Sequence, residues 1–74
     1  MNKTDKKCIR QIIRSISKVD TADCRKEDGD SLDLDKFNRH PDIILKINEL
    51  KQYGVNREWL RNNGYILAAL ILQI

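Results

Sequence analysis

Apolar residues are concentrated in the second half of this chain, and the last nine positions are the most extreme. Residues 66–74 read Ile-Leu-Ala-Ala-Leu-Ile-Leu-Gln-Ile, in which Gln73 alone is strongly polar. A helix that is apolar all round belongs in a core with neighbours on every side. A buried edge strand is the alternative for a run rich in Ile and Leu, but Ala68 and Ala69 favour a helix. Other residues, or a partner, must cover this segment.

A chain of 74 residues forms one small domain, residues 1–74, and buries a smaller share of its surface than larger domains do. Its longest apolar run, residues 65–72, is far shorter than the ~20 residues of a membrane-spanning helix. No secretory leader pattern precedes Cys8 and Cys24. We therefore expect a cytoplasmic protein with reduced thiols, and a single disulfide bridge is the alternative.

Charge is unevenly distributed, although the net charge is only +3. Residues 1–19 carry six basic side chains against Asp5 alone, a net charge of +5. Residues 20–42 carry eight acidic side chains against four basic ones, a net charge of −4. Residues 43–74 carry four basic and two acidic side chains, a net charge of +2. The layout is basic, then acidic, then nearly neutral, and it indicates more about partners than the total does.

Periodicity and capping residues predict an all-α fold, a compact bundle of about four helices. The predicted helices span residues 4–19, 41–53, 56–63 and 65–74. In the first helix, apolar residues recur at helical spacing and the basic residues share the opposite side. Thr4 is the expected N-cap, and Asp5 suits the positive end of the helix dipole. Pro41 is expected at the first position of the second helix, where proline is favoured.

A ten-residue spacing links the second and third predicted helices. Leu50-Lys-Gln-Tyr-Gly54-Val55 aligns with Leu60-Arg-Asn-Asn-Gly64-Tyr65, and Leu70 continues the series. We interpret each copy as a helix end, a glycine in the left-handed conformation and an apolar residue that returns to the core. Asn56 is the expected N-cap of the helix between the two glycines. The predicted core comprises Ile12, Ile13, Ile16, Ile47, Leu50, Leu60, Leu67, Leu70 and Ile71.

Residues 20–31 are predicted to form a mobile acidic loop, because turn formers and charges alternate there with almost nothing to bury. The later series Asp28, Asp30, Asp33 and Asp35 does not have the spacing of a calcium-binding EF-hand loop. Asp33 or Asp35 is expected to cap a short turn through Phe37. His40 is expected at a helix boundary, with no second histidine beside it. We predict no metal site and no cofactor.

The apolar second half leads us to predict a non-enzymatic regulatory or interaction protein. No nucleophile or acid pair stands beside a plausible base, so we do not expect catalysis or a small-molecule substrate. The apolar helices exceed what one amphipathic helix can cover, so we expect a protein partner or self-association, most simply a two-fold homodimer. The predicted interface residues are Ile44, Tyr53, Trp59, Tyr65, Leu72 and Ile74.

A DNA-binding regulator is the alternative prediction. Residues 41–63 resemble the helix-turn-helix family in the length of two helices, 41–53 and 56–63, and of the turn between them. They depart from that family at Glu49, Leu50 and Asn63. The resemblance implies that the second of these helices would read bases while the basic face of the first helix of the chain follows phosphates. The residues expected to contact nucleic acid or an acidic partner are Lys7, Arg10, Arg14, Lys18, Arg57 and Arg61.

Overall fold

The fold is all-α, as the periodicity predicts. The computed structural model describes residues 2–74, and its elements in chain order are α1 (Lys3–Ile16), the 3₁₀ helix η1 (Ala22–Cys24), α2 (Leu34–Arg39), α3 (Pro41–Gln52), α4 (Arg57–Asn62) and α5 (Ile66–Ile71). Residues 2–74 contain no β-strand, only one isolated bridge between Arg25 and Leu32. Helix α2 occupies the stretch where we expected a short turn.

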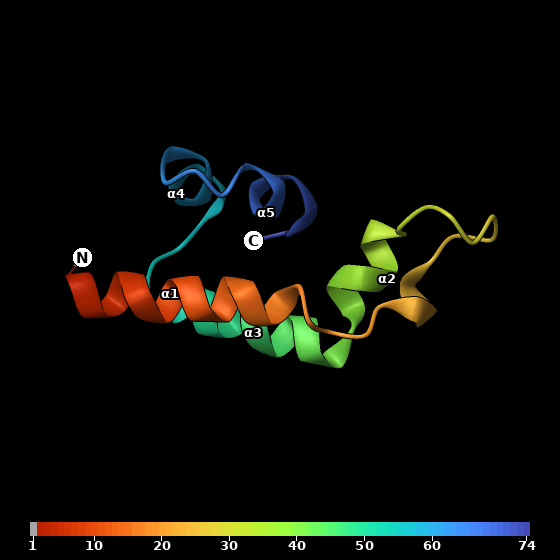
Figure 1. The fold of residues 1–74 in the computed structure, drawn as a ribbon, viewed down its shortest axis with the longest axis horizontal. Coiled ribbons are helices and arrows are strands. Elements are labelled where there is room, and N and C mark those ends of the chain that lie inside the picture. Colours follow the sequence, from red (N-terminus) through yellow and green to blue (C-terminus); the bar gives the residue numbers. More distant parts are fainter. Residues whose placement is uncertain (1) are drawn as a thin grey trace.

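Helices α1 and α3 lie side by side and antiparallel, and they form one layer of the molecule (Figure 1). Helices α4 and α5 pack on each other on one side of that layer. Helix α2 packs against one end of α3, next to η1. The molecule is elongated, with extents of 42 × 20 × 16 Å. The N-terminal end of α1 and the turn before α2 lie at opposite ends of the longest axis (Figure 1).

Helix α1 begins one residue earlier and ends three residues earlier than the predicted range 4–19. Asn2, not Thr4, is the N-cap, because its Oδ1 atom accepts a hydrogen bond from the Asp5 backbone N–H at 2.8 Å. At the other end, the Ser15 and Ser17 hydroxyls donate to backbone carbonyls within the last turn. Such serine back-bonding competes with regular helix hydrogen bonds, and the sequence reading overlooked it.

The two glycine turns have the same hydrogen-bond pattern, as the ten-residue spacing predicts. Gly54 and Gly64 have φ angles of 77° and 86°. In the first turn the Val55 N–H donates to the Leu50 carbonyl at 3.2 Å and the Gly54 N–H donates to the Lys51 carbonyl at 3.0 Å. This pair of bonds defines the Schellman helix ending. In the second turn the equivalent distances are 2.8 Å for Tyr65 to Leu60 and 3.3 Å for Gly64 to Arg61.

The helix starts around these turns are capped by side chains. Asn56 Oδ1 accepts from the Trp59 N–H at 2.8 Å and confirms the predicted cap of α4. Asp33 Oδ1 accepts from the Asp35 N–H at 3.0 Å and caps α2. His40 Nδ1 accepts from the Asp42 N–H at 3.2 Å, next to Pro41 at the first position of α3. His40 is therefore a capping residue at a helix boundary, as predicted.

The acidic segment between α1 and α2 contains η1 and a tight turn. Asp28 Oδ1 accepts from the N–H groups of Asp30 at 2.9 Å and Ser31 at 3.0 Å. The backbone hydrogen bond from Ser31, and then that from Asp30, lowers the pKa of the Asp28 carboxyl. Across the turn, the Lys26 N–H donates to the Ser31 carbonyl at 2.8 Å. Asp33 is half-buried, and the other carboxylates of the segment are exposed. The mobility of this segment stays a prediction.

Helix α5 is shorter than the predicted range 65–74. It ends at Ile71, and Leu72 is extended. Asn38 of α2 accounts for this ending, because its Nδ2 atom donates to the Ile71 carbonyl at 2.9 Å and its Oδ1 atom accepts from the Gln73 N–H at 2.9 Å. The last three residues are thereby held against α2 and do not continue the helix.

The core draws on every helix and on both glycine turns. Its buried members are Ile9, Ile16, Cys24, Phe37, Ile43, Ile47, Leu50, Val55, Leu60, Ala69 and Leu72. Ile16, Ile47, Leu50 and Leu60 were predicted, and the predicted residues Ile12, Ile13 and Ile71 are half-buried against this cluster. The prediction was wrong for Leu67 and Leu70, which are exposed.

The glycine turns give a direct test of backbone conformation. A Cβ atom at Gly54 would meet no heavy atom within 4 Å, so the left-handed φ angle is the only obstacle to a side chain. We expect Gly54→Ala to lower the free energy of unfolding by roughly 1–2 kcal/mol. Gly54→Asn should cost less, because asparagine tolerates this conformation better. Urea unfolding midpoints measure both, and equal midpoints for the two variants would contradict the explanation.

Two leucines at matched positions of the ten-residue spacing should differ strongly. Leu60 is fully buried, so Leu60→Ala should cost roughly 2–5 kcal/mol of unfolding free energy. Leu70 is largely exposed, so Leu70→Ala should change that free energy by less than about 0.5 kcal/mol. Thermal and urea unfolding of the two variants make the comparison, in solutions dilute enough that self-association does not contribute. A large loss at Leu70 would place α5 in a different orientation.

Candidate protein interface

Helix α5 carries apolar side chains on both of its faces. Ala69 and Leu72 face the core with Ala68 half-buried beside them. The opposite face presents Ile66, Leu67 and Leu70, which are 52%, 69% and 66% exposed. At about 100° per residue these three positions fall together on one side of the helix. We call them the α5 patch.

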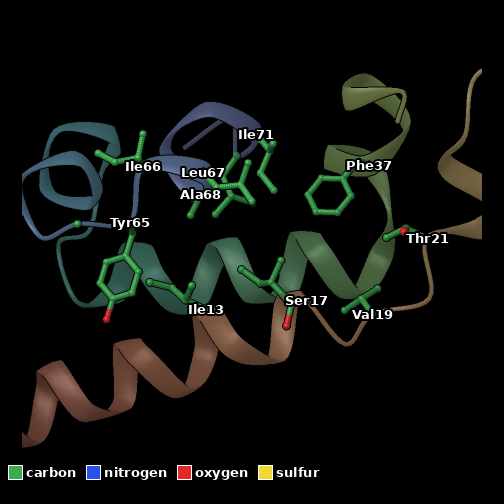
Figure 2. A pocket seen from close by; sticks show the side chains of 13 residues that line it. Ile13, Ser17, Val19, Thr21, Phe37, Tyr65, Ile66, Leu67, Ala68 and Ile71 are labelled. Atoms are coloured by element: carbon green, nitrogen blue, oxygen red, sulfur yellow. The ribbon is translucent and has the colours of Figure 1, made fainter. Parts of the chain in front are cut away.

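A groove adjoins the α5 patch and separates α5 from the C-terminal part of α1. It has a volume of about 450 Å³. Figure 2 shows Leu67, Ala68 and Ile71 of α5 on one side and Phe37 of α2 at one end, with Ile13 of α1 on the other side. Ser17 and Thr21 are the polar side chains at its margin. Patch and groove share Ile66 and Leu67, so together they form one continuous apolar surface.

Two contacts hold α5 in place from its ends. At the start of the helix, the rings of Trp59 and Tyr65 stack with centroids 6.1 Å apart and planes at 9°. The geometry is that of an offset aromatic pair, which contributes beyond simple burial. At the end of the helix, Asn38 holds the backbone of residues 71–73 as described above. The outer face of α5 is thus presented on a helix fixed at both ends.

The predicted interface residues are distributed over several environments. Trp59, Tyr65 and Ile74 are half-buried around α5, and Tyr53 is half-buried at the end of α3. Ile44 is exposed, but it lies on α3 and outside the α5 patch and the groove lining. Leu72 is 1% exposed, so its expected surface position was wrong. The helix ends before Leu72, and its side chain fills the core instead of the surface.

Sequence reasoning missed Leu67 and Leu70 as surface residues because it treated α5 as apolar all round. The spacing of the alanines was the available signal. Ala68 and Ala69 are small and permit close approach to neighbouring elements, so the face that carries them is the face that packs. The large side chains at positions 66, 67 and 70 then point to the other side.

The basic residues predicted to contact nucleic acid or an acidic partner all lie on the surface. Those on the outer side of α1 and just beyond it are Lys7, Arg10, Arg14 and Lys18, and those on α4 are Arg57 and Arg61. The α1 set runs along a single helix face with Ile9 and Ile16 buried on the opposite side. They form a charged strip separate from the α5 patch, and none of them lines the groove.

A smaller polar recess lies between α1 and α3. It is lined by Cys8, Tyr53, Glu49 and neighbouring residues. A hydrogen bond with the Cys8 side chain raises the pKa of the Tyr53 hydroxyl. Both cysteines are free thiols, and Cys24 is buried. Within residues 2–74, no three His, Cys, Asp or Glu side chains are grouped so that they could hold a metal ion.

Comparison with known proteins gave no relative: no protein-family model, no curated protein and no solved structure matches this chain. Across residues 2–74, no helix has the length and apolar character needed to cross a membrane. The structure itself is therefore the basis for a functional proposal.

Asn38 gives a test of how α5 is held. Asn38→Ala removes hydrogen bonds to Leu34, Ile71 and Gln73, so we expect a loss of about 1–2 kcal/mol in unfolding free energy. The Gln73 amide should also exchange faster with solvent. The control is Asn48→Ala, an exposed asparagine on α3. Unchanged exchange at Gln73 in Asn38→Ala would show that the side chain does not hold the C-terminal segment.

Proposed function

We propose that this protein is a non-enzymatic interaction protein that docks another protein, or a second copy of itself, through the α5 patch and the adjoining groove. The observation that carries the proposal is the outer face of α5, where three large apolar side chains are exposed side by side. Contiguous exposed apolar surface of this kind is uncommon on monomeric proteins and usually marks a binding surface.

Helix α5 cannot improve its burial within the chain. Its inner face already packs through Ala69, and Leu72, the residue after the helix, is buried beside it. Turning the helix to bury Leu67 and Leu70 would expose Ala69 and pull Leu72 out of the core. Covering the exposed parts of Ile66, Leu67 and Leu70 would contribute roughly 3–5 kcal/mol per copy, at the usual value for burial of an aliphatic side chain. That gain is comparable to the lower estimates of the entropy lost on association.

The groove supports the same conclusion by its shape. Protein interfaces are most stable where a large side chain of one partner enters a concave apolar site on the other. The groove of about 450 Å³ beside α5 offers such a site, and its margin carries Ser17 and Thr21, as expected for a polar rim. Trp59 stacks on Tyr65 at the start of α5, where an aromatic pair stiffens the surface.

Photo-crosslinking in the cells that make the protein tests the proposal for any protein partner. A photoreactive amino acid at position 70 should give a crosslinked product, either with a second copy or with another protein. The matched control is position 45, because Leu45 is 60% exposed but lies on α3 outside the α5 patch. Equal yields from positions 70 and 45, or no product from position 70, would contradict the proposal.

Nucleic-acid binding is the second candidate, and the exposed basic strip of α1 supports it. Arg10 and Arg14 of this strip are exposed and lie one helical turn apart. Both can contact phosphates while the core residues of α1 stay buried. Helices α3 and α4, joined by the Gly54 turn, keep the order of a helix-turn-helix, although α4 has only six residues. DNA binding would use a surface distinct from the α5 patch.

We expect Arg10→Glu with Arg14→Glu to weaken binding to random duplex DNA and to reduce its dependence on salt. Fluorescence anisotropy at about 50 mM and about 200 mM salt makes the measurement. Leu67→Glu is the control, because it leaves the basic strip intact. If the natural chain shows no salt-sensitive binding at the lower concentration, the nucleic-acid candidate is excluded.

A further inference from the structure

Opposite charges occupy the two ends of the longest axis. One end is the N-terminal half of α1, where the exposed residues Lys3, Lys6 and Lys7 outnumber Asp5; we call it the basic end. The other end comprises η1 and the turn before α2, and we call it the acidic end (Figure 1). Its exposed acidic side chains outnumber its exposed basic ones, Arg25 and Lys26; the acidic ones are Asp23, Glu27, Asp28 and Asp30. The molecule measures 42 Å along this axis. That length is several times the Debye length of about 8–10 Å at physiological salt, so the ends act as independent charges.

Helix α5 lies between the basic end and the acidic end along that axis (Figure 1). This helix carries the α5 patch and contributes residues to the groove lining. The order along the molecule is therefore basic, apolar, acidic. A surface with this order is complementary to a copy of itself that runs in the opposite direction. It is not complementary to a copy that runs in the same direction, because like charges would then meet at both ends.

We infer that the occupant of the α5 patch is a second copy of this chain, placed by a two-fold axis near α5 with the long axes of the copies antiparallel. The inference rests on the proposed function and adds the identity and orientation of the partner. In this arrangement each basic end faces the partner's acidic end. A two-fold axis repeats each favourable charge contact, and it also buries the apolar patch of both copies at once.

The apolar surface is also self-complementary. Leu67 belongs to both the α5 patch and the groove lining, and it is exposed. An exposed side chain next to a groove suits an isologous contact, in which both copies use the same surface. The side chain of each copy then meets the groove of the other. The exposed leucines of each α5 can then enter the groove of the partner, beside the partner's Phe37 and Ile71.

Charge reversal at each end, alone and combined, tests the orientation. The basic-end variant is Lys6→Glu with Lys7→Glu, and the acidic-end variant is Glu27→Lys with Asp30→Lys. Sedimentation equilibrium across a dilution series of the full chain measures the dissociation constant of the dimer. Each single-end variant should raise that constant about tenfold or more, because reversed pairs repel at both symmetric contacts. Added salt should weaken the natural dimer in the same way.

The variant with both ends reversed is the matched control. It restores opposite charges across the interface, so its dissociation constant should return to within about threefold of the natural value. Circular dichroism checks that every variant retains its helices. Leu67→Glu with Leu70→Glu should abolish the dimer altogether, whereas Leu45→Glu should leave it unchanged.

The outcomes separate this inference from the proposed function. A dimer that disappears in Leu67→Glu with Leu70→Glu but keeps its dissociation constant in both single-end variants would overturn the antiparallel arrangement and leave the α5 interface standing. A natural chain that stays monomeric at high concentration, yet crosslinks from position 70 to a different protein, would overturn self-association. A natural chain that stays monomeric and gives no crosslink from position 70 would contradict both the antiparallel dimer and the proposed function.

Discussion

A six-residue helix can turn only one face to its own core, and α5 carries large apolar side chains on the other. Its inner face carries the small residue Ala69, so the helix approaches the core closely, and Leu72 just after the helix is buried beside it. Its outer face keeps Leu67 and Leu70 in solvent. The hydrophobic effect favours covering those groups, and nothing within residues 2–74 covers them. The interaction surface that we propose follows from this constraint.

The rest of the chain fixes that helix in position. The two Schellman turns, centred on Gly54 and Gly64, end α3 and α4 and return Val55 and Tyr65 to the core. Each turn needs a left-handed residue, which is why glycine recurs at a spacing of ten. At the C-terminal end of α5, the Asn38 side chain forms hydrogen bonds with the Ile71 carbonyl and the Gln73 N–H in place of further helical hydrogen bonds. A rigid support of this kind lowers the entropy lost when the patch binds, and so favours association.

The sequence predicts the helices whose signals are local. Gly54, Gly64, Asn56 and Pro41 each act on the adjacent backbone, and all four stand where the pattern placed them. Features that depend on distant contacts were not predictable in the same way. Asn38 reaches residues more than 30 positions away, so the early end of α5 could not be read from residues 65–74 alone.

The same reason explains the errors in the candidate site. Leu67, Leu70 and Leu72 are chemically alike, and only the direction in which α5 packs distinguishes a surface leucine from a core one. The expected interface residues around the aromatic pair, Trp59 and Tyr65, do lie next to α5. The basic and acidic runs were visible in the sequence, but their separation to opposite ends of the molecule required the fold (Figure 1).

The central claim is that the outer face of α5 is exposed in a single copy and covered in the complex. Methyl-resolved NMR with a soluble paramagnetic agent measures this directly, because the agent broadens only accessible methyl groups. In dilute solution, Leu67 and Leu70 should broaden strongly while Leu60 and Leu72 do not. At high concentration, Leu67 and Leu70 should become protected. Protection of Leu67 and Leu70 that is already complete at the lowest concentration, in a chain shown to be monomeric, would contradict the account.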